Sequence, residues 1–146
     1  MLRTNQIDMK YKLNEPKMLA DITEGTAIVI NSVTGIYYGM NYFGTAIYEN
    51  LLAGCAIDDI NTAVAALPGA PADVEEKIRA FVDKLIAFEI IVPDESSATK
   101  PAAIDPVIAE ADSFTPACKD YKDIQELLFA DPIHEVDADE GWRPEK

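Results

Sequence analysis

The stretch from Gly35 to Gly54 constrains the fold of this chain most, because it predicts a strand that leads directly into a helix. Residues 36–40 contain an isoleucine and two adjacent tyrosines, which suit a pleated surface. Asn41 is a good helix N-cap, since its side-chain oxygen can accept a hydrogen bond from a free amide of the first turn. Gly54 then supplies a helix stop. The junction at Asn41 therefore predicts a fixed angle between a sheet and a helix layer.

Further strands are expected before this stretch and further helices after it. Residues 18–23 and 26–30 are strand candidates separated by a turn at Glu24 and Gly25, and residues 31–35 have the composition of a hairpin loop. Helices are expected at about 42–53, at about 57–67, and from a capping-box variant at 73–76 through Leu85. The predicted fold class is α+β and winged helix-turn-helix-like, with a small antiparallel sheet of about three strands followed by three helices.

The composition changes at Pro93. Residues 93–146 hold 14 acidic and 5 basic residues and six of the nine prolines. We therefore expect an N-terminal arm at 1–16, a folded domain at 17–92, a linker at 93–119 and an extended acidic docking tail at 120–146. The apolar residues of that tail are too dense for a purely solvated segment.

The charge balance excludes several classes of partner. The chain has 26 acidic and 12 basic residues and a net charge of −14, which argues against nucleic acid and against an anionic membrane surface. It has no apolar run of about 18 residues and no signal-peptide core, so a soluble, cytoplasmic protein is expected. Cys55 and Cys118 are expected to be free thiols.

The sequence offers no constellation of residues for catalysis. Its single histidine, His134, lies in the acidic tail without the spacing of a metal site, and we expect a surface or capping role. The glycines match neither a phosphate-binding loop nor a dinucleotide fingerprint. The chain is therefore expected to be no enzyme and to use no cofactor or metal.

A winged-helix order of elements raises the possibility of a transcription regulator. Such domains bind DNA through a basic recognition helix. Here the candidate helix carries Lys77, Arg79 and Lys84 against five carboxylates, so it would repel phosphate on balance. DNA binding remains the less favoured alternative, and a gel shift would test it.

The strand edge at residues 35–40 suggests peptide binding instead. An edge of so small a sheet exposes free amides and carbonyls, which are either protected or used to add a strand from another chain. Lys77, Phe81 and Lys84 recur along one side of the third expected helix. A slot between the two would suit an extended acidic and apolar peptide. The alternative is that Phe81 belongs to the core and the lysines are solvated.

Several of these residues together resemble the PqqD-like family, named for the coenzyme PQQ synthesis protein D. The resemblance covers residues 17–92 and is carried by Thr26-Ala-Ile-Val-Ile30, Tyr37-Tyr38-Gly39-Met40-Asn41, Gly44-Thr-Ala-Ile-Tyr48-Glu-Asn-Leu-Leu52, Ile78-Arg-Ala-Phe-Val-Asp-Lys-Leu85 and Ile90-Ile-Val92. Members of this family are precursor-peptide recognition elements for ribosomally made, modified peptides. The tail of about 50 residues has no counterpart in the founding members.

The resemblance implies a winged-helix-like fold that binds a leader peptide and not DNA. In that family the peptide adds as a strand to the third strand of the wing, lies against the third helix, and is delivered to a modifying enzyme, often a radical SAM maturase. Carried over by position, with Lys77 added from the slot described above, the implied peptide-binding residues are Ile36, Tyr37, Tyr38, Gly39, Met40, Lys77, Ile78, Phe81, Val82, Lys84 and Leu85.

A second hypothesis is a module that binds itself. Residues 133–136 of the tail are extended in character, apolar at alternate turns and flanked by acids, so the tail could occupy the groove in cis or in a partner subunit. This would be autoinhibition, or a homodimer formed by strand addition.

Overall fold

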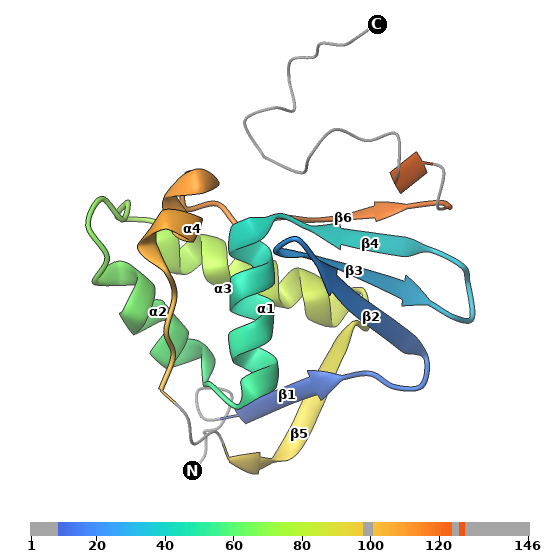
Figure 1. The fold of residues 1–146 in the computed structure, drawn as a ribbon. Helices are drawn as coiled ribbons and strands as arrows, with labels where there is room; N and C mark the ends of the chain where they lie inside the picture. Colours follow the sequence, from blue (N-terminus) through green and yellow to red (C-terminus); the bar gives the residue numbers. More distant parts are fainter. Residues whose placement is uncertain (1–8, 98–100, 124–125, 128–146) are drawn as a thin grey trace, which may run out of the picture.

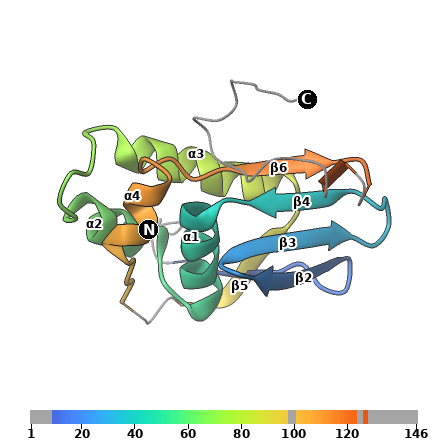
Figure 2. The same cartoon turned by 45° about the horizontal axis from the view of Figure 1, so that its top comes forward.

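The computed structural model describes residues 9–97, 101–123 and 126–127, and it confirms the α+β class with small antiparallel sheets (Figure 1). The larger sheet has four strands in the order β2-β3-β4-β6, with β2 at Met18–Thr23, β3 at Thr26–Asn31, β4 at Tyr37–Met40 and β6 at Cys118–Tyr121 (Figure 2). The first three are the expected strands. The fourth comes from the C-terminal part of the chain.

Local turn chemistry sets the register of β2, β3 and β4. Glu24 and Gly25 both have positive φ, 55° and 84°, and form the tight turn between β2 and β3. In the next loop the Asn31 side-chain oxygen accepts hydrogen bonds from the amides of Val33 and Thr34. Gly35 follows with φ 80°, a conformation that favours glycine. Both turns were predicted from the sequence.

Three helices follow β4 and lie together beside the sheet (Figure 1). They are α1 at Tyr42–Ala53, α2 at Ile57–Ala65 and α3 at Val74–Ala87, close to the expected ranges. Ala56 makes no side-chain cap at the start of α2, and the burial of Ile57 anchors that start instead. The predicted capping box of α3 is not formed, since Asp73 makes no side-chain cap bond, but Glu75 and Glu76 do lie at the positive end of the helix dipole.

The core fills the space between the sheet and the helices. Its largest fully buried side chains come from β2, β3 and β4, from all three helices, and from the start of β5, and they include Met18, Val29, Met40, Phe43, Ile47, Leu51, Ile60, Ile78, Leu85 and Ile91. On α1 and α3 these buried positions recur at helical spacing in the sequence. Burial of this kind contributes about 1.5–3 kcal/mol for each large apolar side chain.

The N-terminal region differs from the expected loose arm. Residues Met9–Leu13 form β1, which pairs antiparallel with β5 at Ile91–Ser97, and Tyr11 is buried. Pro93 was expected to lie just beyond the end of the folded domain. It lies instead within β5, opposite Tyr11, because this two-stranded sheet consists only of edge strands, where proline is tolerated.

The range expected as a linker also differs from the expectation. It contains the end of β5, the helix α4 at Pro106–Ala111 and the first residues of β6. Asp105 caps α4 by accepting a hydrogen bond from the Val107 amide, and Pro106 occupies the first turn. An aspartate followed by proline is a recognised helix start, so the signal for α4 was present in the sequence. Most of the expected docking tail, including His134 and residues 133–136, lies outside the described residues.

Candidate functional site

The site is organised around Asn41, at the corner between β4 and α1. Its side-chain oxygen accepts a hydrogen bond of 2.8 Å from the Gly44 amide, which is the predicted N-cap of α1. The residue is almost fully buried, at 1% exposure. A buried amide side chain has two donors and an acceptor to satisfy, so the cap bond alone leaves hydrogen-bonding capacity unused.

The remaining capacity of Asn41 binds the main chain just before β6. Its side-chain oxygen also accepts from the Ala117 amide at 3.0 Å, and its side-chain nitrogen donates to the Thr115 carbonyl at 2.9 Å. The Asn41 backbone amide donates to the Ala117 carbonyl at 3.1 Å. One residue therefore joins the start of a helix, the end of a strand and a segment that lies more than 70 positions further along the chain.

Gly44 allows that segment to approach α1 closely. A Cβ at this position would lie 2.8 Å from the Asn41 side-chain oxygen, 2.9 Å from the Ala117 carbonyl oxygen and 3.0 Å from the Phe81 ring. Contacts this short require the neighbouring atoms to shift. Glycine at position 44 is therefore needed for close packing and not for an unusual backbone angle.

From Ala117 the chain continues as β6 along the outer side of β4. The two strands are antiparallel, with Cys118 opposite Met40 and Tyr121 opposite Tyr37. Cys118 and Met40 are both fully buried, and burial raises the pKa of the Cys118 thiol to about 12, with a smaller opposing effect from Lys84. β6 therefore occupies the edge of β4 that the sequence had suggested as free.

The residues that lead to β6 are fixed at several points along α1. We call residues 101–121 the C-terminal strap. The Asn50 side chain pairs with Ala103 in both directions, accepting from its amide at 3.0 Å and donating to its carbonyl at 3.2 Å. Asp112, which is 4% exposed, accepts a hydrogen bond of 2.8 Å from the Phe43 amide in the first turn of α1. The bond to Asp112 satisfies a buried amide of the first helical turn that would otherwise have no partner.

Aromatic contacts also hold the strap against α1 and the sheet against the end of α3. Phe114 packs edge-on against Phe43, with ring centroids 6.2 Å apart. On the sheet, Tyr38 packs against Phe88 just after α3, with centroids 4.7 Å apart. Such pairs add about 0.5–1.5 kcal/mol each beyond simple burial.

The structure brings the two groups of expected peptide-binding residues to the same region. The β4 residues Tyr37, Tyr38, Gly39 and Met40, with Ile36 before them, form the strand that pairs with β6. On α3 the side chains of Ile78, Phe81, Val82 and Leu85 are core residues, while Lys77 and Lys84 reach the surface beside β6. Peptide binding by any of these residues remains a prediction.

A hollow of about 270 Å³ lies between α3 and the start of β6. Its lining comes from Lys77, Ala80, Phe81 and Lys84 on α3 and from residues 115–119. The Lys77 ammonium group donates to the Thr115 hydroxyl at 3.0 Å, which ties α3 to the strap. Residues 115–119 were missed from the sequence as part of any site, because they lay in the expected linker.

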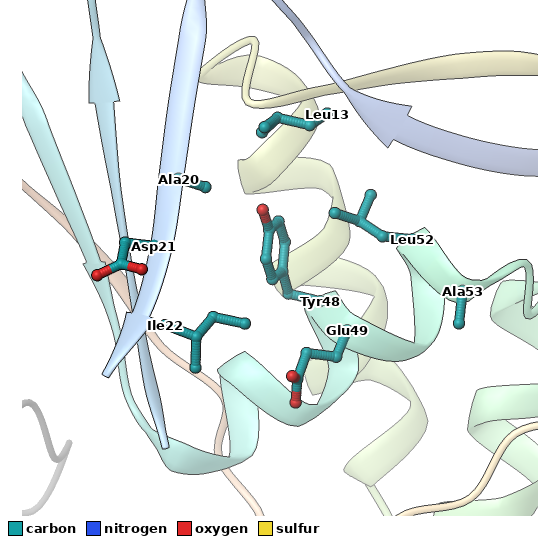
Figure 3. A pocket seen from close by; sticks show the side chains of 8 residues that line it. All are labelled: Leu13, Ala20, Asp21, Ile22, Tyr48, Glu49, Leu52 and Ala53. Carbon is teal, nitrogen blue, oxygen red and sulfur yellow. The ribbon is translucent and has the colours of Figure 1, made fainter. Parts of the chain in front are cut away.

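A second hollow, of about 500 Å³, lies between β2 and α1, with Leu13 of β1 also in its lining (Figure 3). Tyr48 stands in its middle, with its hydroxyl end directed toward Leu13 and Ala20. Burial raises the pKa of Tyr48 to about 12, with Glu15 and Glu49 adding to the rise, so the phenol stays protonated at neutral pH. The lining is otherwise apolar apart from Asp21 and Glu49.

The described part of the chain contains no group of three or more histidine, cysteine or acidic side chains that could hold a metal ion. Within the same residues, no helix is long and apolar enough to cross a membrane. Comparisons of the chain with protein-family models, with curated proteins and with solved structures found no match.

The environment of Cys118 predicts a thiol that resists modification. At pH 8.5 a thiol with a pKa of about 12 is ionised roughly 1000-fold less than one with the ordinary value of 9.0. We expect a thiol reagent to modify Cys118 at least about 1000-fold slower than in the urea-unfolded chain, because the thiol is both fully buried and protonated. Mass spectrometry of the labelled peptides separates Cys118 from Cys55. Modification at the unfolded rate, levelling off near pH 9, would show that β6 does not cover this thiol.

Proposed function

We propose that this protein is a non-catalytic peptide-binding chaperone. It captures the leader of a ribosomally made precursor peptide by strand addition and presents it to a modifying enzyme, such as a radical SAM maturase. The observation that carries this proposal is that an extended segment, β6, already lies antiparallel along the sheet edge beside α3. This edge and this helix face therefore have the geometry that an added strand requires.

The order of the elements supports the same class of protein. Three antiparallel strands lead at Asn41 into three helices, which is the order that the resemblance to PqqD-like proteins implies. In the proposed function this unit is a winged-helix-like domain that has lost DNA binding. In its third helix the carboxylates of Glu75, Glu76 and Asp83 alternate with the basic residues, and the chain as a whole has a net charge of −14. Both features disfavour binding to the phosphates of DNA.

Strand addition also explains how such a groove could serve a leader peptide. Main-chain hydrogen bonds along a sheet edge supply affinity that depends little on sequence, while side chains from the neighbouring helix select among peptides. The exposed Lys84 and the half-buried Lys77 are placed for that selection on α3. No bond of the peptide is made or broken by the domain itself in this proposal.

The proposal predicts where a leader peptide binds. Adding a synthetic leader peptide encoded by a neighbouring open reading frame should shift the amide resonances of residues 37–40, 74–87 and 115–121. The matched control is the same peptide methylated on alternate backbone nitrogens, which removes main-chain donors and should abolish the shifts. Shifts confined to other residues, or equal binding of the methylated peptide, would contradict strand addition at this edge.

A second candidate function is self-association, and the position of β6 favours it specifically. The strand that covers β4 comes from the same chain, so the same pairing could form between two subunits by exchange of their straps. In that case the groove would hold a strand of a partner subunit, and the protein would be an interaction module and not a peptide chaperone.

A single substitution separates pairing within one chain from pairing between two. Met40 and Cys118 are direct partners across the two strands. Directly opposed residues of antiparallel strands have Cα atoms about 4.5–5.5 Å apart, which is within the range of a disulfide. Oxidised Met40→Cys should give a covalent monomer in non-reducing electrophoresis if β6 pairs in cis, and Met40→Cys/Cys118→Ser should form no such bond. A covalent dimer would establish strand exchange and favour self-association.

A further inference from the structure

The two faces of α3 that border hollows carry opposite charge. One small hollow is lined by Glu75, Glu76, Arg79 and Asp83 along with Ala80. The hollow beside β6 is lined by Lys77, Lys84 and Lys119 and by no carboxylate. In a chain with a net charge of −14, this basic surface is a local reversal of the overall charge.

The exposed lysines of this surface are available to a partner, whereas Lys77 is half-buried and donates to the Thr115 hydroxyl. Among the described residues, the ion pairs join Lys10 to Asp94 and Lys17 to Glu89, and neither involves the hollow beside β6. Lys84 and Lys119 are exposed. Lys84 lies with its ammonium 5.9 Å from the centre of the Phe88 ring, which helps to hold its aliphatic stem along α3.

The strand that borders this surface has an unpaired outer edge. Within the described residues β6 pairs with β4 alone, and it is the last strand of its sheet. β6 itself is firmly held, because Asn41 binds the main chain at Thr115 and Ala117 and Cys118 is fully buried. An incoming strand would therefore meet the edge of β6 before it could reach β4.

We propose that the groove between the outer edge of β6 and α3 binds an extended acidic peptide as a fifth strand of the sheet. This inference rests on the proposed function but moves the binding site outward by one strand, from β4 to β6. β6 is then a permanent wall of the groove, and the leader does not displace it. The main chain of the peptide pairs with β6, and its carboxylates lie against Lys77, Lys84 and Lys119. Charge complementarity selects an acidic peptide over a basic one. A surface of three lysines is too small for the many phosphate contacts that hold a nucleic acid.

The test uses the full chain and two synthetic peptides. One peptide alternates valine with aspartate and glutamate, and its matched control carries asparagine and glutamine in their place. The acidic peptide should shift the amide resonances of Cys118–Tyr121 and of residues 77–84, and the neutral peptide should bind about tenfold more weakly. Lys84→Gln/Lys119→Gln should weaken the acidic peptide by about tenfold, whereas Lys12→Gln, an exposed lysine on β1, should not.

A disulfide lock distinguishes this inference from displacement of β6. The acidic peptide should bind oxidised Met40→Cys, in which the new thiol is joined to Cys118, as tightly as it binds the reduced form. Tyr37→Cys/Tyr121→Cys provides a second lock, on the opposite face of the same strands, should the loss of Met40 disturb the core. The reduced form of each variant serves as its folding control.

Each other outcome decides against the inference. Loss of binding in the locked protein would show that the peptide replaces β6, which overturns the fifth-strand site but leaves the proposed function intact. Equal affinity for the two peptides, or no effect of the two lysine substitutions, would overturn charge selection. Contacts of residues 128–146 with the groove in the free chain would make the protein's own tail the occupant. Failure of both the acidic peptide and the natural leader to bind would overturn the proposed function as well.

Discussion

The hydrogen bonds of Asn41 hold together the parts of this protein that define its candidate site. Its side chain caps α1 through Gly44 and fixes the main chain of Thr115 and Ala117 at the head of β6. An amide is suited to this position because it both donates and accepts, which neither a carboxylate nor a hydroxyl can do with the same geometry. Because the group is buried, each bond that it fails to make would cost about 1–3 kcal/mol.

This arrangement protects a sheet edge that would otherwise be exposed. The edge of β4 would otherwise expose a row of unpaired amides and carbonyls, which invites association with other chains. β6 covers that edge, and the strap that carries it is fixed along α1 by Asn50 and Asp112. The open edge is thereby moved outward by one strand. It now lies next to lysines of α3 and not next to the core.

Much of the first domain could be predicted because its signals are local. The turn at Glu24 and Gly25, the cap at Asn41 and the apolar stripes of α1 and α3 each involve residues within a few positions of one another. The strap could not be predicted in the same way. Its attachment depends on pairs such as Asp112 with Phe43, which are 69 positions apart, and such pairs leave no periodic pattern in the sequence.

The same difference between local and long-range signals explains why only part of the candidate site was predicted. Strand β4 and the lysines of α3 were identified together, since the fold class implied that a strand edge and the third helix would be neighbours. The strand between them was not foreseen. The helix-start signal at Asp105 and Pro106 was the only indication that the expected linker is folded. That signal does not indicate where the following residues lie.

The central claim is that Asn41 holds β6 on the sheet independently of its role as a helix cap. Amide hydrogen exchange in Asn41→Asp tests it most directly, because aspartate can still cap α1 but cannot donate to the Thr115 carbonyl. We predict that the amides of Cys118–Tyr121 exchange about 5–150-fold faster than in the unaltered protein, as a loss of about 1–3 kcal/mol implies, while those of α1 and β3 keep their protection. Unchanged exchange in β6, or an equal loss of protection in α1, would contradict the claim.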